Sequence, residues 1–140
     1  MNGKMMNVLL VEDDEVDARI VKRAFREAKI SNPLHVVKDG VEALAALRGN
    51  GELPFAKPHL ILLDLNLPRM NGIEFLAELR ADESLRDNVV FVFSTSNSSE
   101  DRAKAYQLNV AGYIVKSMDG EGSVDVVTML DHYWRVVTLP

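Results

Sequence analysis

Four short apolar runs of the chain each end on a charged or hydroxyl-bearing residue. Residues 8–11 lead into Glu12, Asp13 and Asp14, residues 60–63 into Asp64, residues 89–93 into Ser94, and residues 113–115 into Lys116. Apolar and polar residues do not alternate within these runs. This pattern predicts strands that are buried on both faces, as in a parallel sheet covered by helices.

Segments with apolar residues at helical spacing separate the runs. Between residues 15 and 28, one stripe carries Ile20, Val21, Ala24, Phe25 and Ala28. Further helices are expected at residues 41–47, 100–108 and 123–134, and Ala103 and Tyr106 of the second are expected to face inward. Another helix should begin after Asn71, which can cap it, and carry Ile73, Leu76 and Leu79.

A fifth strand is expected at residues 34–37, and residues 48–58 are expected to form a long loop. The strand–helix unit is then repeated five times, which indicates an α/β fold with a doubly wound parallel sheet. Right-handed crossovers place helices on both faces of such a sheet. Ligands of these folds bind at the carboxyl ends of the strands, where the four polar endings would meet.

The predicted crevice suits a divalent cation and a phosphoryl group. Glu12, Asp13 and Asp64 would bring together three carboxylates, whose repulsion a cation relieves. Mg²⁺ prefers oxygen ligands and needs only one or two carboxylates from a protein. Asp64 is the best candidate for a nucleophile that forms an acyl phosphate. Lys116 offers a positive charge, and Ser94 offers a hydroxyl donor.

Taken singly, each of these residues also has a structural interpretation. An Asp after a strand is typical of a turn or a helix cap. The acidic triplet 12–14 suits the start of the following helix, and the Ser/Thr-rich segment 94–99 suits a loop with an N-cap. Lys116 alone fits a surface lysine. The occurrence of all four at successive strand ends favours the phosphoryl site.

Composition narrows the class of protein. A chain of 140 residues, 47% hydrophobic and 26% charged, suits one soluble domain. The net charge of −5 and the lack of a basic cluster argue against nucleic-acid binding. No apolar run reaches the ~20 residues of a membrane span. Without cysteines or a signal peptide, a cytoplasmic location is expected. Residues 1–6 are expected to be flexible, and residues 134–140 form an apolar tail.

The chain resembles the receiver domain of bacterial response regulators over nearly its whole length. The motifs that carry the resemblance are residues 10–14, residues 63–72, residues 94–96 and residues 112–116. The 30-residue interval from Asp64 to Ser94 and the 22-residue interval from Ser94 to Lys116 also fit. The resemblance implies a single receiver domain over residues 1–140, with a flavodoxin-like sheet of strand order 2-1-3-4-5.

The resemblance also implies specific roles for the site residues. The protein would accept a phosphoryl group from a histidine kinase with the help of Mg²⁺, and it would catalyse only its own phosphorylation and slow dephosphorylation. Asp64 would be the phosphoacceptor, and Ser94 and Lys116 would contact the phosphoryl group. Tyr113 would move inward as Ser94 closes on that group. The metal would be held by Glu12 through water, by Asp13, by Asp64 and by the backbone carbonyl of Asn66.

A narrower resemblance links the chain to the stand-alone regulators of bacterial phytochrome kinases. It rests on the long loop before residues 58–60, on residues 94–97 and on the ending 133–140. It implies a phytochrome-type kinase partner and an unknown downstream protein, contacted through the fourth helix, fifth strand and fifth helix. The apolar residues of the ending, Tyr133, Trp134, Val136, Val137 and Leu139, predict either a homodimer contact or packing on the outer helices.

Two positions depart from the receiver pattern. Ser117 follows Lys116, where the family usually has a proline after a cis bond. A cis bond before a non-proline residue costs about 2.5–4 kcal/mol, so we predict a trans bond and a slightly shifted loop. Thr95 stands where many receivers carry Ala or Gly, and its bulk predicts slower loss of the phosphoryl group.

Two other functions fit parts of the pattern. A hydrolase with an aspartyl-phosphate intermediate would need a second acid two residues after its nucleophile, where this chain has Asn66. A flavin-binding electron carrier would need a hydroxyl-rich phosphate loop after the first strand, where this chain is acidic. A yellow purified protein would support the second alternative.

Overall fold

A computed structural model describes residues 7–29, 34–49, 53, 57–58, 60–116 and 123–140. It contains one five-stranded parallel sheet in the order β2-β1-β3-β4-β5, which confirms the predicted fold class and strand order. The strands are β1 (Val8–Val11), β2 (Leu34–Val37), β3 (Leu60–Leu63), β4 (Val90–Ser94) and β5 (Gly112–Val115). The helices are α1 (Glu15–Glu27), α2 (Gly40–Leu47), α3 (Gly72–Ala81), α4 (Ser99–Gln107) and α5 (Ser123–Val136).

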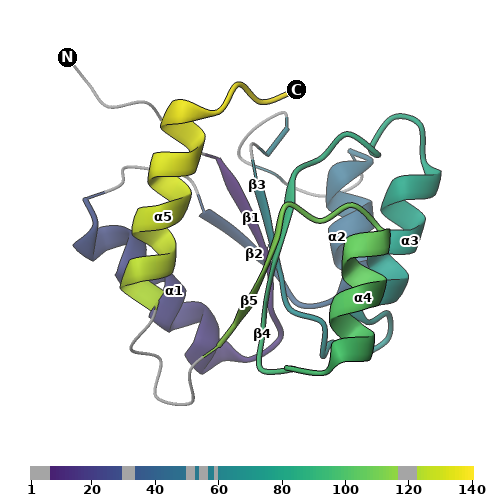
Figure 1. The fold of residues 1–140 in the computed structure, drawn as a ribbon, viewed down its shortest axis with the longest axis horizontal. Helices are drawn as coiled ribbons and strands as arrows, with labels where there is room; N and C mark the ends of the chain where they lie inside the picture. Colours follow the sequence, from purple (N-terminus) through teal and green to yellow (C-terminus); the bar gives the residue numbers. More distant parts are fainter. Residues whose placement is uncertain (1–6, 30–33, 50–52, 54–56, 59, 117–122) are drawn as a thin grey trace.

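The helices form two layers around the sheet. Helices α1 and α5 cover one face, and helices α2, α3 and α4 cover the other (Figure 1). Successive strand residues point to opposite faces, so Leu9 and Val11 join the core under α2–α4, while Val8 and Leu10 join the core under α1 and α5. Burial on both faces explains why the central strands β1 and β3 are apolar throughout, whereas the edge strand β2 is less buried and carries His35.

Most helices begin immediately after a strand because a polar side chain caps them there. Asp14 accepts hydrogen bonds from the backbone amides of Val16 and Asp17, and Asp39 and Ser98 cap α2 and α4 in the same way. Asn71 caps α3 as predicted, in a reciprocal capping box with Glu74. The polar strand endings lie at one edge of the sheet because all five strands are parallel.

Helix α4 differs from its prediction. Ala103 and Tyr106 were expected to face inward, but both are exposed, and 49% of the Tyr106 surface is accessible. Ala105 is buried instead, and Leu108, at the C-cap, packs partly against the same core. The prediction was wrong because this short, polar helix carries apolar residues on two sides. The spacing of these residues is compatible with either side being the buried face.

The other boundaries agree closely with expectation. Helix α5 ends at Val136, two residues beyond the predicted end at 134, and α2 begins at Gly40 rather than at Val41. In the part of the chain that the structure describes, no helix is both long and apolar enough to span a membrane. The expectation for residues 1–6 and the predicted trans bond before Ser117 both fall outside the described residues.

Candidate functional site: an acidic crevice at the strand ends

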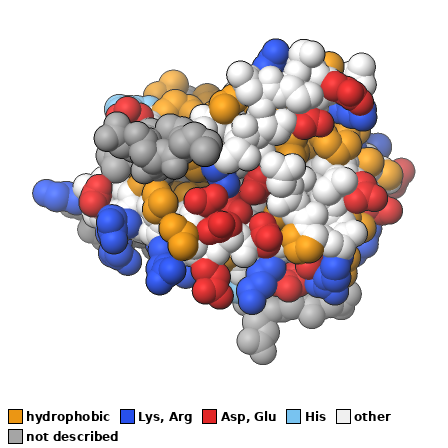
Figure 2. Space-filling model, turned by 90° about the horizontal axis from the view of Figure 1, so that it is seen from below, with side chains coloured by type: hydrophobic (Ala, Val, Ile, Leu, Met, Phe, Trp, Pro, Cys, Tyr) orange, Lys and Arg blue, Asp and Glu red, His pale blue; other side chains and the backbone are white. Residues whose placement is uncertain are grey.

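Strand pairing brings the predicted site residues to one edge of the sheet. The Glu12 amide donates to the Val37 carbonyl at 2.9 Å, and the Asp64 amide donates to the Val11 carbonyl at 3.0 Å. On the other side of β3, the Lys116 amide donates to the carbonyl of Ser94 at 2.7 Å. Seen from below, this edge presents a group of acidic side chains near its centre, with Lys and Arg side chains towards the rim (Figure 2).

Three carboxylates form the centre of the crevice. Glu12, Asp13 and Asp64 each place one oxygen within 4.8 Å of the others. Glu12 and Asp64 are buried, whereas Asp13 is exposed. A hard divalent cation takes oxygen ligands and keeps several waters, so two buried carboxylates beside an exposed one suit such a cation. The donor set therefore fits a divalent cation.

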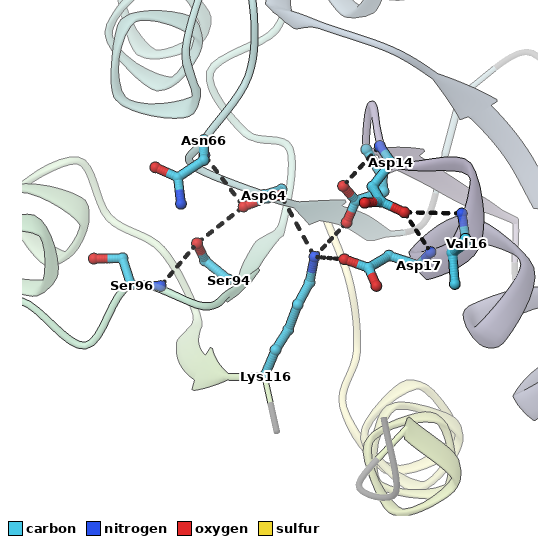
Figure 3. A network of polar contacts seen from close by, with 9 residues as sticks. Asp14, Val16, Asp17, Asp64, Asn66, Ser94, Ser96 and Lys116 are labelled. Atoms are coloured by element: carbon cyan, nitrogen blue, oxygen red, sulfur yellow. Dashed lines mark hydrogen bonds and ion pairs between the residues drawn. The ribbon is translucent and has the colours of Figure 1, made fainter. Parts of the chain in front are cut away.

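Two hydrogen bonds hold one oxygen of the Asp64 carboxylate. The Ser94 hydroxyl donates to Oδ1 at 2.9 Å, and the Asn66 backbone amide donates to the same atom at 3.2 Å (Figure 3). Ser94 has no accessible surface, and its Oγ accepts a bond from the Ser96 amide at 3.3 Å. The carboxylate is thus fixed through Oδ1, and its other oxygen, Oδ2, faces Lys116.

Lys116 contacts three carboxylates from different elements. Its Nζ pairs with Glu12, lies 3.0 Å from Asp17 Oδ2 and lies 3.4 Å from Asp64 Oδ2 (Figure 3). Only 7% of its side chain is exposed. Burial alone would lower the pKa of Lys116, but the hydrogen bond to Glu12 and the charge of Asp64 outweigh it, and the pKa is raised. The ammonium therefore stays charged and partly neutralises the crevice.

The Glu12 carboxyl is the strongly shifted acid of the site. Burial, reinforced by the neighbouring charge of Asp64, raises its pKa to about 7, although the hydrogen bond from Lys116 acts in the opposite direction. A carboxyl with a pKa near neutrality loses its proton to solvent when a cation binds the carboxylate. This property makes Glu12 the pH-sensitive member of the cluster.

Tyr113 is connected to the site through Ser96, in the loop after β4. Its ring packs against the core under α2–α4, and its hydroxyl donates to the Ser96 carbonyl at 2.9 Å. The Ser96 hydroxyl donates in turn to Asp101 Oδ2 of α4 at 2.6 Å. Ser96 therefore connects Ser94, Tyr113 and the first turn of α4, a connection that the sequence analysis did not predict.

Gly72 packs directly under the Asp64 backbone. A Cβ atom added at Gly72 would lie 2.6 Å from the Asp64 carbonyl oxygen and 2.7 Å from the Leu65 Cα. Its amide donates to the Leu65 carbonyl at 3.0 Å. The first residue of α3 must therefore be glycine if α3 is to approach the loop that carries Asp64 this closely.

The structure brings five of the predicted side chains into one crevice: Glu12, Asp13, Asp64, Ser94 and Lys116. Asn66 is exposed beside Asp64. Asp17 is the contributor that sequence reasoning missed. Its acidic side chain in the first turn of a helix resembles an ordinary helix-terminal charge, and its partner Lys116 lies 99 residues away.

Comparison with known proteins shows the same fold and sequence pattern. Residues 8–128 match the response regulator receiver domain family. The chain is 37% identical over 135 residues to the response regulator Rcp1 of Synechocystis sp., and the match covers 95% of this chain and 92% of that protein.

Two solved structures superpose closely. The phosphorylated cyanobacterial phytochrome response regulator RcpA is 37% identical, with a TM-score of 0.88 over 98% of this chain and 99% of that one. The Mn²⁺-bound form of Rcp1 is 36% identical, with a TM-score of 0.85 over 96% of this chain and 99% of that one. The similarity of the fold therefore extends over nearly the whole chain.

Proposed function

The chain belongs to the response regulator receiver family, and on this basis we propose that Asp64 accepts a phosphoryl group from a histidine kinase. The observation that carries the proposal is the fixed Asp64 carboxylate, with Ser94 on Oδ1 and Lys116 facing Oδ2. Proteins of this family are signalling proteins. In this proposal, the protein's own chemistry is limited to accepting the phosphoryl group and losing it slowly.

Glu12, Asp13, Asp64 and the backbone carbonyl of Asn66 would hold the Mg²⁺ ion. The cluster of three carboxylate oxygens supports this assignment, and the relative Rcp1 has a Mn²⁺-bound form. When bound, the cation would supply positive charge opposite the phosphoryl oxygens.

The transfer step can be written from the residues in the crevice. Oδ2 of Asp64 attacks phosphorus, the new O–P bond forms, and the N–P bond of a phosphohistidine donor breaks, so that the leaving imidazole takes up a proton from solvent. Ser94 holds Oδ1 during the attack and then donates its hydroxyl to the phosphoryl group. Lys116 needs no change of charge, because its raised pKa keeps the ammonium protonated, and it pairs with the new phosphoryl oxygens.

The phosphoryl group would be sensed through the loop after β4. Phosphorylation adds negative charge at Asp64 and draws Ser94 onto the phosphoryl group, and Tyr113 fills the space that Ser94 vacates. The hydrogen bonds from Tyr113 to Ser96 and from Ser96 to Asp101 support this route, because they connect the crevice to α4. The readout surface would be formed by α4, β5 and α5, and an as yet unidentified cytoplasmic protein would bind it.

The C-terminal region is the second element of this proposal. Val136 is 81% exposed and Val137 is 39% exposed, whereas Tyr133 and Trp134 pack against the core under α1 and α5. A homodimer that buries the end of α5 would cover these two valines. Light scattering with and without beryllofluoride would test this contact, and a monomeric mass in both conditions would contradict it.

The kinase partner is proposed to be of the phytochrome type, which the similarity to Rcp1 and RcpA supports. Phosphotransfer from a panel of purified histidine kinases, phytochrome-type kinases among them, would test the proposal. We expect preferential transfer from a phytochrome-type kinase to the wild type and none to Asp64→Asn. Transfer to Asp64→Asn at the wild-type rate would overturn the assignment of Asp64. Equal transfer rates from phytochrome-type and other histidine kinases would overturn the proposed partner.

A further inference from the structure

We propose that Asp17 is a positioning residue that holds the Lys116 ammonium against α1 while a divalent cation occupies the carboxylate cluster. The inference rests on the proposed metal site and adds a residue to it. The Asp17 carboxylate is 3.0 Å from Nζ of Lys116, and the two residues come from α1 and from the end of β5.

Asp17 is free for this task because other groups cap its helix. Asp14 Oδ1 accepts from the amides of Val16 and Asp17 at 2.8 and 3.0 Å. The Asp14 amide, which an acid at the position of Asp17 can bind in a capping box, donates instead to Glu12 Oε2 at 3.2 Å. The Asp17 carboxylate is therefore directed to Lys116, not to the end of α1.

Asp17 also differs from the other two partners of Lys116. Glu12 and Asp64 belong to the carboxylate cluster that would bind the cation, and Asp17 does not. A divalent cation repels the ammonium and competes with it for those two carboxylates. Asp17 is the partner that remains available to Lys116 when the cation binds.

Burial makes this remaining partner necessary. Only 7% of the Lys116 side chain is exposed, so an ammonium displaced from Glu12 and Asp64 would otherwise lose its hydrogen bonds in a poorly solvated position. Asp17 is 36% exposed and offers the ammonium a hydrated edge of the crevice. Asp17 thereby allows a cation and a lysine to occupy the same crevice.

The test is a double-mutant cycle on Mg²⁺ affinity, measured by calorimetry on the full chain. The variants are Asp17→Asn, Lys116→Met and the double variant, with Glu15→Gln as the matched control. Glu15 lies in the same first turn of α1, it is exposed, and among the described residues its side chain makes no contact with Lys116. Both the control and Asp17→Asn remove one negative charge from that turn.

We expect Asp17→Asn to weaken Mg²⁺ binding about fivefold and Glu15→Gln to weaken it less than about twofold. In the Lys116→Met background, the added Asp17→Asn change should have less than about a twofold effect, because the ammonium that Asp17 positions is gone. Chemical unfolding of each variant would confirm that the fold is retained.

Two outcomes would overturn the inference: equal affinities of Asp17→Asn and Glu15→Gln, or an Asp17→Asn effect that persists undiminished with Lys116→Met. Failure of the wild type to bind Mg²⁺ would instead contradict the proposed metal site.

Discussion

The Ser94 hydroxyl donates a 2.9 Å hydrogen bond to Oδ1 of Asp64, and this bond joins the ends of two neighbouring strands. It fixes the orientation of the carboxylate before any phosphoryl group arrives. Because Ser94 is fully buried and also accepts from the Ser96 amide, its hydroxyl connects Asp64 to the loop that leads into α4. The Ser94 hydroxyl thus positions the Asp64 carboxylate and can transmit its phosphorylation to the loop that leads into α4.

Replacement of Ser94 by Ala should therefore both slow phosphorylation and destabilise the fold. We expect phosphorylation of Ser94→Ala by acetyl phosphate to slow about tenfold, because a hydrogen bond to a charged group, worth about 1.5 kcal/mol, is lost. The free energy of unfolding should fall by about 1 kcal/mol, as expected when a buried hydrogen bond is removed. Ser94→Thr keeps the hydroxyl and serves as the control. Equal phosphorylation rates for Ser94→Ala and wild type would contradict this role.

Thr95 should control how long the phosphoryl group persists. Thr95 is exposed and directly follows Ser94, so its side chain can restrict the approach of water to the crevice. We expect Thr95→Ala to lose its phosphoryl group several-fold faster than the wild type, with the decay followed by intact-protein mass spectrometry. Thr95→Val, which keeps the bulk without the hydroxyl, should decay like the wild type. Identical decay of the Ala variant and the wild type would refute the steric explanation.

Gly72→Ala should damage the site through the backbone. The new Cβ would lie 2.6 Å from the Asp64 carbonyl oxygen, so the loop around Asp64 must shift. We expect a loss of about 1–3 kcal/mol in the free energy of unfolding, together with slower phosphorylation. Gly112→Ala is the matched control, since its Cβ would lie 3.0 Å from the Phe91 ring and meets no atom of the loop that carries Asp64. It should destabilise the fold while phosphorylation remains close to normal; comparable slowing in both variants would contradict a local effect.

Glu12 should make the metal-free protein less stable as pH rises towards neutrality. Burial, with the charge of Asp64, raises the pKa of Glu12 from 4.5 to about 7, so the folded state binds more protons than the unfolded state between these values. The free energy of unfolding contributed by Glu12 is therefore fully present below pH 4.5 and is lost as pH rises through about 7.

Urea unfolding in EDTA across this range would measure the effect, with Glu12→Gln as reference, since its side chain does not titrate. The wild type should lose more stability than the variant between pH 5 and pH 8. Because metal binding requires the carboxylate, stabilisation by Mg²⁺ should grow over the same interval. Parallel pH profiles for the two proteins would show that Glu12 has an ordinary pKa.

The features that the sequence predicted well depend on local pattern. Apolar runs identified the central strands β1, β3 and β4, which are buried throughout, and also the less buried edge strand β5. The other edge strand, β2, carries His35 and was predicted from the apolar residues around it. The polar residues that follow four of these strands were brought together because parallel strands end at one edge of the sheet. The Asn71 cap was also predictable, because its hydrogen bonds lie within one helical turn.

The features that were missed depend on contacts between distant segments. Asp17 reaches Lys116 only once folding brings the first turn of α1 and the end of β5 together. Nothing in that turn distinguishes this acid from a helix-terminal charge. Tyr106 was assigned to the wrong side of α4 because apolar residues on a short helix do not identify its buried face when tertiary packing decides it. The need for glycine at position 72 follows from the approach of α3 to the Asp64 backbone.

Intact-protein mass spectrometry after incubation with acetyl phosphate and Mg²⁺ would show whether Asp64 is the phosphoacceptor. We predict a gain of about 80 Da on the wild type, as expected for one phosphoryl group. Borohydride reduction of the acyl phosphate, followed by peptide analysis, should place the modification at Asp64. The gain should disappear in Asp64→Asn and in wild type treated with EDTA. A gain of the same mass on Asp64→Asn, or on another residue of the wild type, would contradict the central claim.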